Sequence, residues 1–346
     1  MAYDTRFYGL DFSFDSFNGM PYTNLGGSGL RVSRVGLGTW KMGYPERRDG
    51  SRVGRDQAFQ VLDRAVELGV TFWDTANRYN ESSGNSERLL GEWFRVHSQE
   101  RRNIVLATKL GGAMDGVSPN HGGLSRASVL DSTYASLDRL GIDRIDVLQF
   151  HRTDPLTPVE ESLAAVADLR ARDLVRYFGL SNATVADLVE YQEVARQYHL
   201  PMLCSVQNNF SPLTGERPSH RGVLEFCALH RVSFIAYSPL GRGLLTNRYL
   251  PGRPVGQGDR LVDEGVLEEM TRGDVAARLQ RLEAVASRLG LTVAQLSLAY
   301  MLHLPGMGPL IPSASKVAQL EENARAALVA LSEDTLTELR PIFTTA

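Results

Sequence analysis

Short apolar runs that resemble β-strands alternate along the whole chain with longer segments of helical periodicity. Eight runs have the length and composition of buried strands: 33–38, 70–74, 104–109, 145–150, 175–180, 203–207, 232–237 and 308–312. The segments between them place apolar residues on one helical face, and RDQAFQVLDRAVELG, which ends at Gly69, is a clear example. Strands that alternate with helices favour a parallel sheet with right-handed crossovers.

Eight strand–helix units in one chain predict an α/β fold of the (β/α)8 TIM barrel type, with an open doubly wound sheet as the alternative. The stretch YTNLGGSGLRVSR predicts a β-hairpin with its turn at Gly26–Gly29, placed as a cap on the bottom of the barrel. The long loops 41–54, 111–125 and 241–273 are expected at the C-terminal face. No linker divides the chain, so we expect an N-terminal extension over 1–21 and a single barrel domain over 22–346.

Composition narrows the class of protein. With 346 residues, 43% of them hydrophobic and 22% charged, the chain has the values of a globular protein with a large core. A net charge of −3 gives no electrostatic case for binding nucleic acid or an anionic membrane. No apolar run approaches the ~20 residues of a membrane span, and the N-terminus lacks the apolar region of a signal peptide. These features predict a cytoplasmic protein that binds neither nucleic acid nor membrane.

The cysteines and histidines do not form a recognisable metal or disulfide pattern. The two cysteines, Cys204 and Cys227, make no CxxC motif, and the seven histidines are scattered. We therefore expect no metal site and assign both cysteines to packing. At least one of Trp93 and Phe94 is likewise expected in the core.

Polar or titratable residues stand at the end of nearly every predicted strand. In a barrel, these carboxyl ends face the active site. Asp74, Lys109 and His151 end or follow three consecutive strands, so they should converge. Unpaired charge at a buried strand end is costly, which favours a functional role for them. The other strand ends supply Ser181, Asn182, Gln207, Asn208, Tyr237, Ser238 and Ser313.

Tyr79 lies in the loop after Asp74 and completes a set suited to acid catalysis. An ammonium beside a phenol stabilises the phenolate and lowers its pKa from about 10. We expect Lys109 to act in this way on Tyr79, with Asp74 holding the lysine charged and His151 binding a substrate oxygen. A Schiff-base aldolase using Lys109 is the alternative, although the adjacent Asp74 opposes the low pKa that it needs.

Several longer stretches are distinctive when taken in order. They are NLGGSGLRVSRVGLGTW, FWDTANRYN, GNSERLLG, IVLATKLGG, RASVLDSTYASLDRLGIDRIDVLQFHRTDPLTPVEESLAAVADL, VRYFGLSN, VQNNFSPL, IAYSPLGRGLLT and IPSASKVAQLEENARA. Together they resemble the aldo-keto reductases, and HRTDPLTPVEESL points to the branch that includes bacterial reductases and potassium-channel β subunits. The resemblance implies an NAD(P)H-dependent oxidoreductase on a (β/α)8 barrel. It also implies a catalytic tetrad of Asp74, Tyr79, Lys109 and His151.

The same resemblance implies a cofactor site along the C-terminal face. Ser181, Asn182 and Gln207 would bind the nicotinamide carboxamide, Tyr237 would stack on the ring, and Asp74 also belongs to this set. The nicotinamide end would be lined by Gly38, Thr39 and Trp40. The pyrophosphate would lie along the loop that contains Ser238, Leu240, Gly241 and Arg242. Ser313, Lys316, Gln319 and Asn323 would reach the adenosine end, the last three from one helical face. Many relatives place an arginine in this segment to grip the 2′-phosphate, whereas the cation here before Arg325 is Lys316, which lacks the bidentate fork. NADP is the expected cofactor, with NAD as the alternative.

The resulting prediction is reduction of an aldehyde or ketone to an alcohol by hydride transfer, with Tyr79 as general acid. A cofactor-binding partner subunit with little turnover, like the channel β subunits, is the alternative. The polar loops hint at a polar or sugar-like carbonyl substrate, and His121 is a candidate contact for it. Asn80 stands where many relatives carry Gly, and asparagine tolerates left-handed backbone. The sequence leaves the oligomeric state open.

Overall fold

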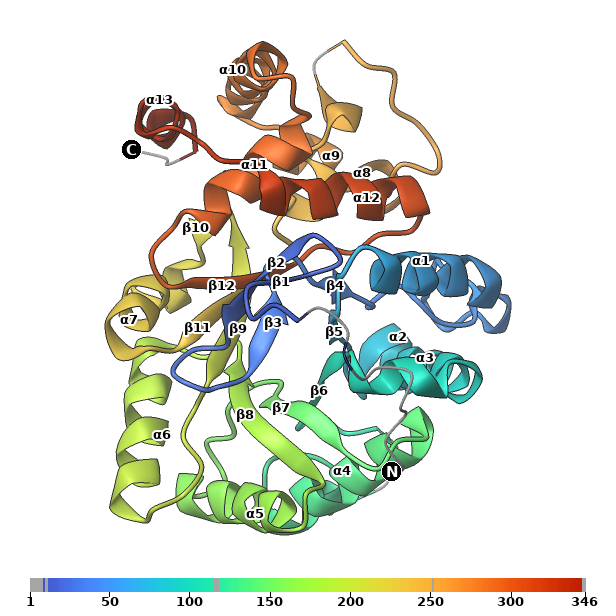
Figure 1. Cartoon of the computed structure of the whole chain (residues 1–346), viewed down its shortest axis with the longest axis vertical. Coiled ribbons are helices and arrows are strands. Elements are labelled where there is room, and N and C mark those ends of the chain that lie inside the picture. The colour runs from blue at the N-terminus through green and yellow to red at the C-terminus, as the bar shows by residue number, and fades with distance from the viewer. Residues whose placement is uncertain (1–8, 10–11, 115–117, 251, 344–346) are drawn as a thin grey trace.

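The computed structural model describes residues 9, 12–114, 118–250 and 252–343. Eight parallel strands form a ring in the order β12-β11-β9-β8-β7-β6-β5-β4 (Figure 1). They are β4 (Leu37–Gly38), β5 (Phe72–Asp74), β6 (Val105–Leu110), β7 (Ile145–Phe150), β8 (Val175–Ser181), β9 (Ser205–Ser211), β11 (Ser233–Tyr237) and β12 (Met307–Ile311). Parallel bridges join Val35 to Leu310 and Gly38 to Ser313, and they close the ring. The predicted TIM barrel is confirmed, and the alternative of an open sheet is wrong.

Helices cover the outside of the ring (Figure 1). They are α1 (Arg55–Glu67), α3 (Asn85–Val96), α4 (Arg126–Leu140), α5 (Val159–Ala171), α6 (Val185–Gln197), α7 (Val223–His230), α11 (Val293–Leu302) and α12 (Val317–Arg325). In α1 the buried side chains are Ala58, Val61, Leu62 and Ala65. These are the i, i+3, i+4 and i+7 positions of the predicted apolar face, so burial against the strands explains the periodicity.

Further helices lie beyond the ring. The helices α10 (Val275–Arg288) and α13 (Glu333–Phe343) pack around a second apolar cluster that includes Leu245, Leu282 and Leu339. The short elements are α2 (Tyr79–Ser82), α8 (Arg260–Asp263), α9 (Leu267–Met270) and β10 (Gly215–Glu216). No single helix among the described residues has the length and apolarity to cross a bilayer; α10 and α11 pass that test only as a pair, and they bend by 89°.

The first barrel strand is shorter than predicted. The run 33–38 is divided between β3 (Arg31–Ser33), which belongs to the hairpin, and β4, which contains only Leu37 and Gly38. The Ser33 hydroxyl accepts hydrogen bonds from the backbone N–H groups of Thr71 (3.2 Å) and Phe72 (3.1 Å), which fixes the end of the hairpin beneath β5. One apolar run therefore serves two elements. Strand β9, by contrast, is longer than predicted at its end. It continues past residue 207 to Ser211, because its last residues pair with β10.

The predicted hairpin closes the N-terminal end of the barrel. Strand β2 (Met20–Asn24) pairs antiparallel with β3, and β1 (Ser16–Phe17) adds a third strand. Leu25 and Val32 are buried in a cluster with strand residues such as Phe72, Val147 and Ile235. In Figure 1 the hairpin lies across the middle of the ring, which confirms the cap.

The predicted division at residue 22 stays a prediction, although β2 begins two residues earlier, at Met20. Residues 1–8, 10 and 11 of the predicted extension lie outside the described residues, as do 344–346 at the end of the predicted domain. The same holds for 115–117 in the loop 111–125 and for 251 in the loop 241–273.

The residues assigned to packing are buried. Trp93 and Phe94 both contact Trp73 of β5, with ring centroids 4.8 and 5.9 Å from that indole. Cys204 and Cys227 are buried and free, and burial raises the pKa of Cys204 to about 11. A buried thiol that stays protonated is a packing residue, as predicted.

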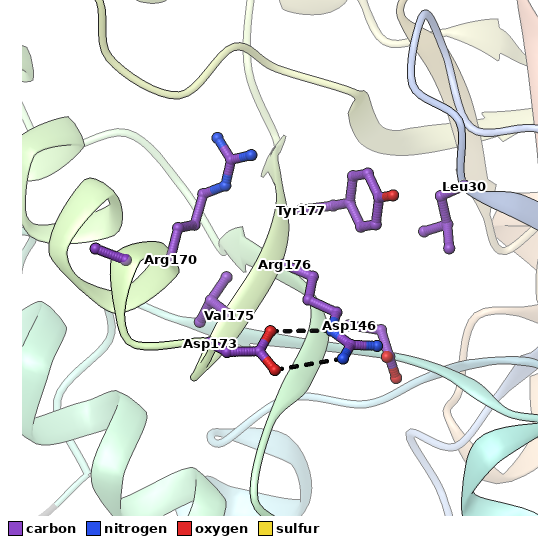
Figure 2. Close-up of a pocket in the computed structure, with 8 residues that line it drawn as sticks. Leu30, Asp146, Arg170, Asp173, Val175, Arg176 and Tyr177 are labelled. Carbon is purple, nitrogen blue, oxygen red and sulfur yellow. Dashed lines mark hydrogen bonds and ion pairs between the residues drawn. The ribbon is translucent and has the colours of Figure 1, made fainter.

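A cavity of about 640 Å³ opens at the N-terminal end of β7 and β8, on the side of the barrel away from the strand ends that carry the tetrad. Its lining is Leu30, Asp146, Arg170, Ala171, Asp173, Val175, Arg176 and Tyr177 (Figure 2). Asp173 and Arg176, both in this lining, form an ion pair of 3.1 Å. Among the described residues, no group of three His, Cys, Asp or Glu side chains could hold a metal ion here or elsewhere.

Candidate active site

Three neighbouring strands bring the predicted tetrad together. Asp74 is the last residue of β5, Lys109 lies on β6, and His151 follows β7. These strands are parallel neighbours, with Asp74 opposite Ala107 and Lys109 opposite Gln149. Tyr79 begins the short helix α2 in the loop after β5. The structure therefore places all four side chains at the C-terminal end of the barrel.

The centre of the site is a buried ion pair. The Lys109 ammonium donates to both Asp74 oxygens at 2.8 and 2.7 Å, to the Thr75 carbonyl at 2.8 Å and to the Tyr79 hydroxyl at 2.8 Å. Asp74 and Lys109 are each only 1% exposed. Burial lowers the pKa of Lys109, and the Asp74 carboxylate opposes that shift. All three ammonium protons have acceptors, so the lysine is held as a cation and not as a free nucleophile.

Two glutamines complete the shell around the carboxylate. Gln149 and Gln207 each donate to Asp74 Oδ1, at 3.2 and 2.7 Å. Gln207 was predicted as a cofactor contact, whereas Gln149 was missed. The two-residue period of a strand would have predicted Gln149. Val147, Gln149 and His151 share the face that points into the barrel, and the residues between them face outward. These two hydrogen bonds fix the orientation of the Asp74 carboxylate towards Lys109.

Tyr79 is half-buried and its hydroxyl lies against the ion pair. The phenol donates to Asp74 Oδ2 at 3.1 Å and accepts from Lys109. Burial raises the pKa of Tyr79 well above 10, and the Asp74 charge raises it further. The predicted lowering of this pKa is therefore wrong here, because Asp74 neutralises the lysine charge that would stabilise a phenolate. The phenol stays protonated at neutral pH and can serve as a proton donor.

His151 is a neutral imidazole beside Tyr79. Burial lowers the pKa of His151 to about 3, and the charges of Lys109, Arg78 and Arg152 act in the same direction. Its ring centroid is 6.0 Å from that of Tyr79, in an edge-to-face arrangement. A neutral histidine offers one N–H donor, which suits hydrogen bonding to a carbonyl oxygen without competing as an acid.

This shift predicts an acid sensitivity that can be measured. Between pH 6.5 and about 3 the unfolded chain protonates His151 and the folded protein does not. The stability that His151 contributes is therefore complete above pH 6.5 and is lost as the pH falls towards 3. We expect denaturant unfolding of wild type and His151→Gln to differ by a constant free energy above pH 7, with wild type losing stability relative to the variant below pH 6. A constant difference down to pH 4 would contradict the shift.

The loop that carries Tyr79 has left-handed backbone. Asn80 has φ 56° and Glu81 has φ 60°. The Asn80 side chain donates to the Met42 carbonyl at 2.7 Å, which ties the loop to the one after β4. Asn80 stands where many relatives carry Gly, and it adopts the left-handed conformation predicted for that position.

The predicted nicotinamide contacts gather beside the tetrad. Asn182, with φ 53°, donates to the His151 carbonyl at 2.9 Å and accepts from the Tyr237 hydroxyl at 2.8 Å. The Ser181 hydroxyl donates to the Gln207 carbonyl at 2.9 Å. Thr39 is fully buried and its hydroxyl donates to the Asp74 carbonyl at 3.0 Å, so this side chain serves the fold. These bonds hold the ends of β8, β9 and β11 together around one surface.

The predicted pyrophosphate loop adopts an unusual backbone. Ser238, Gly241 and Arg242 have φ values of 55°, 54° and 59°. Leu240 packs against the core, while Arg242 pairs with Glu264 at 3.3 Å. This stretch is a tight 3-10 turn, Gly241–Gly243, at the strand end where the cofactor was predicted.

The long loops after β4 and β11 contact each other. Trp40 is 38% exposed, with Lys41 Nζ 4.2 Å and the Arg260 guanidinium 5.2 Å from its ring centroid. Arg52 and Asp263 add an ion pair of 3.4 Å between the loops. Cation–π and ion-pair contacts therefore join the two loops beside Gly38 and the predicted nicotinamide end.

The predicted adenosine contacts lie around the start of α12. Ser313 is bridged to Gly38, and Gln319 accepts hydrogen bonds from Ser315. Lys316 is exposed and is the N-cap of α12, whereas Asn323 is 3% exposed within the helix. The predicted common helical face for Lys316, Gln319 and Asn323 is thus corrected, because the helix starts only at Val317. His121 is exposed in the 3-10 helix Pro119–His121, and its contact with substrate stays a prediction.

Comparison with known proteins identifies the family of the chain. Residues 34–342 match the model of the aldo/keto reductase family. Aldo-keto reductase AFTS1 of Alternaria alternata is 32% identical over 338 residues, 90% of this chain and 89% of that protein. Aldo-keto reductase str7 of Strobilurus tenacellus is 32% identical over 322 residues, also 90% and 89%. A probable voltage-gated potassium channel subunit beta of Arabidopsis thaliana is 31% identical over 313 residues, 89% of this chain and 91% of that protein. The chain belongs to the aldo/keto reductase family.

Proposed function

We propose that this protein is an NADPH-dependent reductase of aldehydes or ketones, with Tyr79 as general acid. Membership of the aldo/keto reductase family supports an oxidoreductase function. The observation that carries the finer proposal is the hydroxyl of Tyr79, which contacts both members of the buried Asp74–Lys109 pair and lies beside the neutral His151. A phenol, an ammonium and a neutral imidazole are the groups needed to protonate a carbonyl oxygen.

Each residue has a separate role in this reaction. A reduced nicotinamide held at this site would supply the hydride for the carbonyl carbon. The Tyr79 phenol donates its proton to the oxygen that becomes the alcohol, and the Lys109 ammonium, which donates a hydrogen bond to the Tyr79 oxygen, holds that oxygen in place during the transfer. His151, through its single N–H, orients the carbonyl oxygen. Asp74 accepts from the Tyr79 hydroxyl at 3.1 Å and pairs with Lys109, but it exchanges no proton with the substrate, so its role in this reaction is to hold those two groups in position.

The described residues fit a nicotinamide dinucleotide. Tyr237 offers an aromatic face at the end of β11, and Asn182 holds its hydroxyl in place. At the opposite end of the site, the exposed Lys316 occupies the N-cap position of α12. A helix N-terminus with an adjacent cation suits a phosphate monoester, which favours the 2′-phosphate of NADP over NAD.

The cofactor preference predicts the effect of one substitution. Replacing Lys316 by Ala removes a charge-assisted contact to the 2′-phosphate, so we expect the KM for NADPH to rise about 10-fold. The KM for NADH should stay within about twofold, because NADH lacks that phosphate. Steady-state kinetics with both cofactors measures the two values. If the KM values for NADPH and NADH rose by the same factor, Lys316 would not contact the 2′-phosphate.

A panel of aldehydes with NADPH tests the function as a whole. Steady oxidation of NADPH that stops when the carbonyl substrate is withheld supports the reductase. Tight binding of NADPH without turnover on any carbonyl would instead favour a partner subunit, since the Arabidopsis relative is a probable potassium channel subunit beta. Borohydride trapping of a substrate adduct on Lys109 would revive the aldolase alternative.

A further inference from the structure

Two arginines stand next to the reacting rings, and the proposed reaction uses neither. Arg78 directly precedes Tyr79, and Arg152 directly follows His151. Both side chains are exposed and arise from loops at the C-terminal ends of β5 and β7. Strand β6, which carries Lys109, lies between those two strands in the ring. The arginines therefore approach the tetrad from its two sides.

Arg78 packs against the backbone that follows β6. A β-carbon added at Gly112 would lie 2.0 Å from Arg78 Cδ and 2.5 Å from its Nη1. Such distances require that the guanidinium lies directly on the chain at Gly112, three residues after Lys109. The side chain is thus directed from the β5 loop toward the β6 loop, rather than away from the barrel.

Arg152 lines a cavity of about 260 Å³ beside the same loop. The lining residues are Gly111, Gly123, Leu124, Arg152, Thr153, Asp154, Pro155 and Leu156. The carboxylate in this lining, Asp154, accepts from the backbone N–H groups of Leu124 (2.8 Å) and Leu156 (3.0 Å) and from the Thr157 hydroxyl (2.8 Å). The Asp154 carboxylate therefore stabilises the loop after β7 through these three hydrogen bonds. Arg152 makes no hydrogen bond or ion pair with any residue that the structure describes.

The charge of both arginines reaches the reacting groups. Arg78 and Arg152 each contribute to the low pKa of His151, together with Lys109. Because Asp74 pairs with Lys109, Arg78 and Arg152 add positive charge at the mouth of the site, and Asp154 offsets part of the Arg152 charge. A bound anion would offset this field, so the site is more complementary to an anionic ligand than to a neutral one.

We propose that the substrate is a carbonyl compound that also carries a carboxylate, and that Arg152, with Arg78, binds this carboxylate beside the tetrad. The inference rests on the proposed function and narrows its substrate class. A guanidinium presents a planar fork of donors that matches a carboxylate in two parallel hydrogen bonds. The cavity of about 260 Å³ is lined by Arg152 and by none of the tetrad residues, so it would take only the carboxylate end of a short oxo-acid.

Matched substrates test the proposal in the whole protein with NADPH. We compare kcat/KM for oxo-acids of three to five carbons, with a terminal aldehyde, against their methyl esters. Wild type should prefer the acid by about 10- to 100-fold, the range of charge-assisted hydrogen bonds. Arg152→Gln should reduce that ratio by about 10-fold or more, and Arg78→Gln should reduce it less. Arg152→Lys keeps the charge but not the fork, so it should restore part of the ratio.

Two further measurements separate this idea from its alternatives. Arg170→Gln, in the cavity at the other end of the barrel, removes a surface arginine and should leave the ratio at its wild-type value (Figure 2). Glyceraldehyde 3-phosphate against glyceraldehyde tests the same chemistry with a phosphate. A larger preference for the phosphate than for any carboxylate would overturn the assignment.

Binding of glutarate, measured by calorimetry, does not depend on turnover. We expect wild type to bind glutarate at least 10-fold more tightly than Arg152→Gln. If glutarate binding depends on Arg152 but no carbonyl is reduced, the anion site stands and the proposed reductase fails. If neutral aldehydes are reduced while neither acid preference nor glutarate binding depends on Arg152, the reductase stands and this inference is overturned.

Discussion

Tyr79→Phe should lower kcat for carbonyl reduction by about 10²- to 10⁴-fold, the range for loss of a general acid. The hydroxyl is the one group of Tyr79 that contacts both Asp74 and Lys109, and phenylalanine keeps the ring that packs edge-to-face on His151. The dissociation constant for NADPH, measured by quenching of protein fluorescence, should change by less than about threefold. Stopped-flow single turnovers would show that the slowed step is chemistry and not product release.

A matched control separates this effect from the loss of any buried hydroxyl. Tyr191 is a buried tyrosine of α6 that packs against Phe150, with centroids 6.4 Å apart, outside the site. Tyr191→Phe should keep kcat within about twofold of wild type. If Tyr79→Phe were as active as Tyr191→Phe, the assignment of the proton donor would be wrong.

Asp74→Asn should affect both the fold and the reaction. It leaves the Lys109 ammonium buried at 1% exposure without its counter-ion, and removing one partner of such a pair costs about 3–5 kcal/mol. Replacing Lys109 by Met in the same chain removes the stranded charge. We therefore expect the double variant Asp74→Asn, Lys109→Met to unfold in denaturant with a stability closer to wild type than to Asp74→Asn.

The kinetic effect of Asp74→Asn has its own signature. The Asp74 charge opposes the lowering of the Lys109 pKa by burial, so without it that pKa falls further. Activity is then lost as the pH rises through a lower value, and the alkaline limb of the kcat profile should move to lower pH than in wild type. A purely structural role would leave the position of that limb unchanged. A variant with the wild-type profile at a temperature where it is folded would contradict the positioning role.

The ring of strands and the convergence of the strand-end residues of the tetrad could be predicted from the sequence. Both follow from the alternation of strands and helices, which repeats along the chain. Strand ends meet at one face of a parallel barrel, and this rule alone brought Asp74, Lys109 and His151 together. The period of two would also have identified Gln149, had it been followed inward from His151. By contrast, the run 33–38 carries no mark of the break between β3 and β4, since the hydrogen bonds to Ser33 come from residues far along the chain.

The electrostatics of the site could not be predicted from residue types. The direction of the Tyr79 pKa depends on how far Asp74 cancels Lys109, and this requires the distances among three groups. The loop contacts are equally non-local: Arg52 and Asp263, which pair between two loops, are 211 positions apart. The place of Lys316 before α12, and not on its face, likewise depends on where the helix begins.

The bond between Gln207 and Asp74 spans the barrel. In the ring order, β5 and β9 are separated by three strands on one side, so they stand opposite each other, and this 2.7 Å bond crosses the interior between them. The Asp74 carboxylate, to which we assign a role in positioning the proton donor, thus also links two opposite strands of the barrel. A related protein that no longer catalysed the reaction would still need this hydrogen bond to link the two strands. Retention of Asp74, Gln207 and Lys109 in a related chain is therefore evidence of an intact barrel interior, and only turnover itself is evidence of catalysis.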